Sequence, residues 1–139
     1  MADDVVLNKV ASLERCVLRV REEHAGSDDN LFANQTRQDA IILNLQRACE
    51  TAIDLAMHLV RLRRLGIPQE TREAFEMLRE AGLLEIGLAE RLQRMVGFRN
   101  VAVHDDRKLD LAIVKAIVTG HLDDFLTFAK AALRLTERP

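Results

Sequence analysis

An arginine, an asparagine and a histidine stand close together in the segment VGFRNVAVHDD, residues 96–106. Arg99 and Asn100 are followed by three apolar residues and then by His104. An imidazole can transfer protons near neutral pH, and a guanidinium matches the oxygens of a phosphate group. These residue types suit a site that acts on phosphate. In the structural alternative, Arg99 pairs with a nearby acid and His104 caps the end of a helix.

The spacing of Arg99 and His104 is weak evidence alone, because Arg19 and His24 are also five positions apart, in a charged helix end. Residues five apart on a straight helix point about 140° away from each other and differ by about 7.5 Å in rise. A site that uses both side chains therefore needs one of two arrangements. Either the helix unwinds before His104, or a second copy of the chain completes the site.

The rest of the sequence predicts the helices that position this segment. Leu, Ala, Arg and Glu dominate, with six glycines, two prolines and no Tyr or Trp, which favours an all-α fold. Apolar residues at three- and four-residue steps predict five helices. These run from about Asp4 to His24, from an N-cap at Thr36 to the segment RLRRLG, from Glu70 to Glu80, from Ile86 towards Val103, and from Asp110 to at least Leu133. Four long helices and one short helix predict an antiparallel bundle, in a single domain of residues 1–139.

The bulk composition narrows the classes of function. The net charge of −2 excludes a global basic field, so any site for a polyanion must be a local patch. Cys16 and Cys49 suit core positions, and no CxxC pair indicates zinc, so we expect neither a metal nor a cofactor. His58 is expected to pack between helices, and His121 has too few potential ligands nearby for a metal site. The acidic N-terminal segment and the absence of long apolar runs predict a cytoplasmic protein with no membrane contact.

The segment MVGFRNVAVHDD, with its pattern R-N-x3-H, resembles the signature of HEPN domains, and most closely that of the HepT-type toxins. The likeness extends to QDAIILNLQRACETAIDLAMHLV, to LGIPQETREAFEML and to LDLAIVKAIVTGHLDDFLTF, so it covers nearly the whole chain. The resemblance implies a HEPN-like helical bundle that forms a homodimer, or a higher assembly, and acts as a metal-independent endoribonuclease on RNA. It also implies an antitoxin partner, a minimal nucleotidyltransferase of the MNT type.

Carried over by position, the resemblance makes Arg99, Asn100 and His104 the catalytic residues. Glu50 and Asp54, four positions apart on one helix face, are candidates to neutralise Arg99 and support the site. Several basic residues are candidates for RNA binding, with a solvated surface as the alternative for each. They are Arg61, Arg63, Arg64, Arg91, Arg94, Arg107 and Lys108.

The sequence departs from the family pattern two residues after His104. The family has a tyrosine there, which the antitoxin adenylylates to silence the nuclease, whereas this chain has Asp106 and no tyrosine at all. Restraint would then depend on binding alone or on another site, or the protein would be a weakened toxin. An acid close to His104 would favour the imidazolium and repel phosphate.

Two functions follow from these observations. The first is the toxin of a type II or related toxin–antitoxin system, an endoribonuclease with its R-x4-H site at a dimer interface. The alternative is a non-catalytic HEPN module that dimerises and engages a nucleotidyltransferase partner. Asp106 favours the alternative, and the intact Arg99, Asn100 and His104 favour catalysis.

Overall fold

The computed structural model describes residues 3–104 and 110–136, and every regular element within these ranges is an α-helix, which confirms the all-α prediction. The helices are α1 (Asp4–His24), α2 (Asp29–Phe32), α3 (Gln35–Leu62), α4 (Thr71–Glu80), α5 (Ile86–His104), α6 (Leu111–Gly120) and α7 (Leu122–Thr136). None of them is long and apolar enough to cross a membrane.

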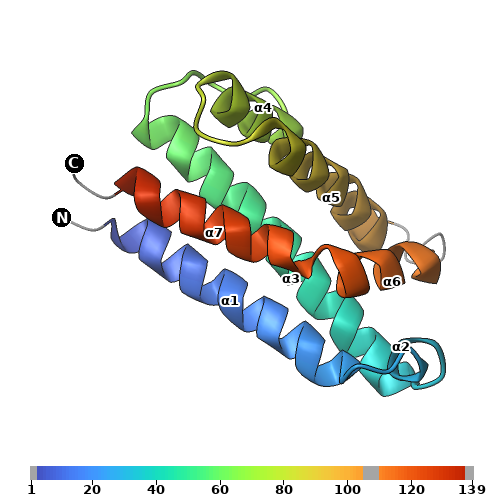
Figure 1. The fold of residues 1–139 in the computed structure, drawn as a ribbon. Coiled ribbons are helices and arrows are strands. Elements are labelled where there is room, and N and C mark those ends of the chain that lie inside the picture. Colours follow the sequence, from blue (N-terminus) through green and yellow to red (C-terminus); the bar gives the residue numbers. More distant parts are fainter. Residues whose placement is uncertain (1–2, 105–109, 137–139) are drawn as a thin grey trace.

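The longest helix, α3, lies at the centre of the bundle (Figure 1). It packs against α1, α4, α5 and α7, and α1 also packs against α7. The chain runs along α1, returns along α3 and runs back along α5, so α5 ends near α6, at the opposite end of the bundle from the α3–α4 connection. The core includes Phe75 on α4 and Phe128 on α7, whose ring centroids are 5.7 Å apart in an edge-to-face arrangement.

Capping residues determine where α1 and α3 begin, and the predicted N-cap of α3 was wrong. Asp3 begins α1, because its side chain accepts a hydrogen bond from the backbone N–H of Val6 at 3.1 Å. The N-cap of α3 is Asn34 rather than Thr36. Asn34 has an extended backbone and its Oδ1 accepts from the N–H of Arg37 at 3.0 Å, so Thr36 already lies in the first turn.

The chain forms two more helices than predicted over its described residues. The loop after α1 contains the single turn α2, and the helix expected from Asp110 onwards is divided into α6 and α7 at Gly120 and His121. Glycine is a poor helix former, and the hydroxyl of Thr119 bonds back to the carbonyl of Lys115, which favours a bend. The acids Asp123 and Asp124 then stabilise the N-terminus of α7.

Removing the aromatic contact at the centre of the bundle should destabilise the fold strongly. Phe128→Ala deletes a fully buried ring and should lower the free energy of unfolding by about 3–5 kcal/mol. Urea denaturation followed by circular dichroism measures the change. The control is Leu18→Ala, at a side chain that is 57% exposed, where we expect less than about 0.5 kcal/mol. Equal losses in the two variants would contradict the assigned core.

Candidate functional site

Helix α5 carries the Arg99–Asn100 pair, and its buried stripe determines where Arg99 points. Leu88, Leu92, Met95 and Val96 are buried at helical spacing. Position 99 continues this stripe, seven residues after Leu92, and the Arg99 side chain is accordingly half-buried. The guanidinium is therefore directed from α5 towards the interior of the bundle, where α5 packs on α3.

The environment of Arg99 includes the buried thiol of Cys49 on α3. Burial raises the pKa of Cys49 to about 12, the nearby positive charge of Arg99 opposes this rise, and the carboxylate of Glu50 adds to it. The thiol is thus neutral at physiological pH and does not form an ion pair with the arginine. The Nε atom of Arg99 is buried, with no hydrogen-bond partner among the described residues. A buried donor without a partner costs folding free energy, so the position of Arg99 is unfavourable unless it binds something.

Asn100, the next residue of the motif, lies on the exposed side of α5 together with Val101. Asn100 is exposed, and Val101 is 38% exposed despite being apolar. The helix continues unbroken to His104, so the chain does not unwind before that residue. On a continuous helix, positions 99 and 104 point about 140° apart. The side chain of His104, and the residues Asp106, Arg107 and Lys108, lie outside what the structure describes.

The predicted supporting carboxylates have partners other than Arg99. Asp54 forms an ion pair with Lys9 on α1, with 3.3 Å between its Oδ2 and the lysine Nζ. Glu50 accepts a hydrogen bond from Gln46 at 3.3 Å, one turn earlier on the same helix. Asp54 is thus tied to α1 rather than to the α3–α5 interface. A supporting role for Glu50 stays a prediction, based on its place beside Cys49.

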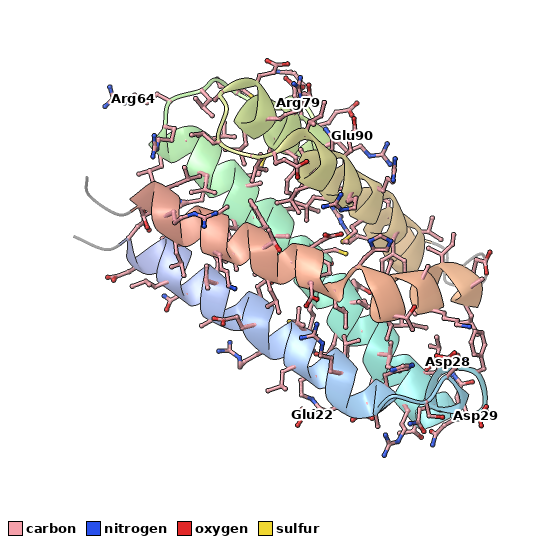
Figure 2. All side chains as sticks on the ribbon, in the orientation of Figure 1. Glu22, Asp28, Asp29, Arg64, Arg79 and Glu90 are labelled. Carbon is pink, nitrogen blue, oxygen red and sulfur yellow. The ribbon has the colours of Figure 1, made fainter. Side chains whose placement is uncertain are left out.

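Within the described residues, the candidate RNA-binding arginines lie at more than one place on the bundle. Arg61, Arg63 and Arg64 follow one another at the end of α3, and Arg64 lies beside the α3–α4 connection (Figure 2). Arg63 donates to the carbonyl of Leu135 at 2.8 Å. Helix α5 begins near this end, and Arg99 lies about 20 Å further along its axis. Arg94 is different, because it is exposed on α5 itself.

A groove between α5 and α6 was not predicted from the sequence. It encloses about 680 Å³ and is mostly apolar, with walls that include Met95, Phe98 and Val101 on α5 and Ile113 and Ile117 on α6. Ile113 is 53% exposed there. Gly97 also lines the groove and Val101 forms part of it, so this surface adjoins the Arg99–Asn100 pair. The only advance signal was Ile113, an apolar residue outside the buried spacing of its helix.

Three histidines are held by acids within the described parts of the chain. His58 bonds to Asp3 at 2.8 Å and His24 to Asp28 at 2.9 Å. His121 bonds through Nδ1 to Asp124 at 3.2 Å. In residues 3–104 and 110–136, no three His, Cys, Asp or Glu side chains lie close enough together to hold a metal ion.

Comparisons with known proteins agree with the fold and with the family resemblance. Residues 12–132 match a family model described as ribonuclease HepT-like. A curated relative, an mRNA nuclease HepT from Shewanella oneidensis, is 43% identical over 126 residues, which cover 91% of this chain and 94% of the relative.

Solved structures are equally similar. The tri-AMPylated HEPN toxin of Shewanella oneidensis, in complex with an MNT antitoxin, superposes with a TM-score of 0.87 at 42% identity, over 93% of this chain and 96% of that one. A toxin–antitoxin structure with AMP-PNP gives a TM-score of 0.85 at 42% identity, over 94% and 98% of the two chains. The match over most of the chain confirms the resemblance seen in the motif, and this protein belongs to the ribonuclease HepT-like family.

Proposed function

We propose that this protein is the toxin of a toxin–antitoxin pair and cuts RNA without a metal ion, at a site formed by two copies of the chain. The family membership and the Arg99, Asn100 and His104 pattern support the nuclease activity. The observation that carries the two-copy site is the unbroken α5. Since Arg99 and position 104 fall on different faces of one helix, a symmetry mate is needed to bring the two groups to one phosphate.

The groove between α5 and α6 supports a homodimer on this face. Val101 and Ile113 are exposed apolar residues at its wall, and burying such surface against a second copy is favourable. Position 104 follows Gly97, Asn100 and Val101 at spacings of seven, four and three, so it falls on the same face of α5. A two-fold partner on this face would therefore meet Asn100 and His104 directly.

The proposed reaction uses the 2′-hydroxyl of the substrate as the nucleophile. His104 accepts the proton from O2′ as the new O2′–P bond forms, and the P–O5′ bond breaks. Arg99 stabilises the charge that grows on the phosphoryl oxygens, and Asn100 donates to one of them or orients the imidazole. The leaving O5′ takes up a proton, so the products are a 2′,3′-cyclic phosphate and a 5′-hydroxyl.

An MNT-type antitoxin is the proposed partner, because the related toxin structure contains one. That toxin is tri-AMPylated, whereas this chain has no tyrosine and carries Asp106 at the motif position. We therefore propose that the antitoxin restrains this chain by binding rather than by tyrosine modification. Asp106 also supports the alternative function, a dimeric module that binds the antitoxin without cutting RNA.

Cleavage should depend on the motif and not on arginine–histidine spacing in general. The native chain should cut single-stranded RNA in EDTA, and His104→Ala or Arg99→Ala should reduce the rate about 100-fold or more. Gel analysis of the fragments and their 2′,3′-cyclic ends measures this, with DNA of the same sequence left intact. The matched control is Arg19→Ala, at the other R-x4-H pair, which should stay fully active. Cleavage that persists in His104→Ala would rule out the mechanism, and an inactive native chain would favour the binding module.

A site built from two copies should be restored by mixing two inactive variants. When Arg99→Ala and His104→Ala chains are co-expressed, a mixed dimer has one site with both groups intact. With random pairing about half of the dimers are mixed, and each mixed dimer has one working site of its two. The mixture should therefore reach up to about a quarter of native activity. Each variant alone is the control. No gain above the single variants, in a sample shown to contain mixed dimers, would place both groups in one chain.

Placing the family's acceptor in this chain should make it modifiable. Asp106→Tyr, incubated with an MNT-type nucleotidyltransferase and ATP, should gain adenylyl groups that intact-mass spectrometry detects. The native chain, treated in parallel, should gain none. Adenylyl groups on the native chain would show that restraint uses another acceptor.

A further inference from the structure

One end of the groove between α5 and α6 carries cationic side chains, whereas Asp110 lines the groove at the opposite end of α6 from His121. Arg91 and Arg94 on α5 line it, together with His121 at the junction of α6 and α7. The Nε of Arg91 donates to both carboxylate oxygens of Asp124, at 3.1 Å each. The Nδ1 of His121 lies 3.2 Å from the Oδ2 of the same carboxylate. One acid thus holds a guanidinium and an imidazole together at the groove wall.

Asp124 is largely buried, whereas Arg91 and His121 are partly exposed. The Asp124 side chain is only 13% exposed, while those of Arg91 and His121 are 37% and 45% exposed. Because Nδ1 of His121 faces the carboxylate, Nε2 is the ring nitrogen left for a ligand. Asp124 lies in the first turn of α7, so a helix fixes its position. The largely buried carboxylate therefore fixes the positions of Arg91 and His121, whose side chains are partly exposed to solvent.

The polar end carries more cationic groups than the ion pair needs. Arg91 already satisfies Asp124, and Arg94 is exposed without an ion pair to any described residue. Glu85 lies near Arg91 around Gly87, but its oxygens accept from the backbone N–H groups of Gly87 and Leu88. A simple tie between α5 and α7 would explain Arg91 and Asp124, but not the adjoining Arg94 and the outward Nε2 of His121.

We propose that Arg91, Arg94 and His121 form a subsite for a backbone phosphate of single-stranded RNA. The inference rests on the proposed nuclease function. The ligand class follows from the donors, which are two guanidinium forks and the Nε2–H that His121 offers in its imidazolium form. Arg91 precedes Arg99 by eight residues, or about 12 Å along α5. The subsite therefore holds a phosphate away from the bond that is cut, and it aligns the strand with the motif. The apolar middle of the groove is left to the partner subunit.

The test measures binding without cleavage. The probe is a short, fluorescently labelled 2′-O-methyl RNA, which has no free 2′-hydroxyl to attack the phosphate. Fluorescence anisotropy measures the Kd of this probe for the full-length protein at salt concentrations from about 50 to about 300 mM. In this range the affinity of phosphate contacts falls steeply with salt. Arg94→Gln and His121→Gln are compared with Arg134→Gln, a matched control at an exposed arginine in the last turn of α7. Thermal melts identify any variant that is not folded, and Arg94 is exposed, so its replacement should leave the fold intact.

We expect Arg94→Gln and His121→Gln each to raise Kd about threefold or more near 0.15 M salt. We also expect Arg94→Gln to reduce the slope of log K against log salt by about 0.7, the value for one lost contact to a single strand. Arg134→Gln should match the native chain. Unchanged Kd and slope in the groove variants, or no binding of the probe to the native chain, would overturn the subsite. The nuclease proposal is tested separately. If the native chain does not cut RNA but binding still depends on Arg94 and His121, the subsite stands and the nuclease mechanism does not.

Discussion

The rotation of about 100° per residue along a continuous α-helix is the constraint on which this site depends. Because α5 runs unbroken to His104, the buried stripe that holds the helix on α3 also carries Arg99 inward, while Asn100 and Val101 lie outward. On a continuous helix, positions 99 and 104 point about 140° apart. This geometry supports the proposed second copy, and the apolar surface between α5 and α6 offers a face on which that copy could dock.

The inward position of Arg99 has a free-energy cost. Its Nε is buried with no hydrogen-bond partner among the described residues, and burial keeps the Cys49 thiol near it on α3 neutral. A purely structural arginine would be expected to have an acid beside it, yet Asp54 is tied to Lys9 on α1. An unmet donor of this kind is tolerated at sites that bind a ligand, since an anion then supplies the missing interaction.

In the proposed function, different parts of the groove contact the partner subunit and the RNA. Its apolar middle, with Phe98 and Ile113, suits contact with protein, and its polar end, with Arg94 and His121, suits contact with phosphate. Asp124 has two roles at the polar end. It stabilises the start of α7, and it holds Arg91 and His121 in place. His121 lies at the break between α6 and α7 and lines the groove wall.

Much of the fold could be predicted because helix periodicity is local: the bounds of α1 and the course of α5 follow from the spacing of their apolar residues. The cap at Asn34 and the break at Gly120 were missed because neighbouring residues compete for the same backbone groups. The sequence alone determined the all-α class, the motif residues and the family to which they belong. Only the tertiary structure decided that Arg99 faces α3, that Arg64 lies at the far end of the bundle, and that Arg91 and His121 share one acid. His121 is only three positions from Asp124, but Arg91 is 33 positions from the same acid. Contacts between residues so distant in the chain depend on how the helices pack, which no local pattern encodes.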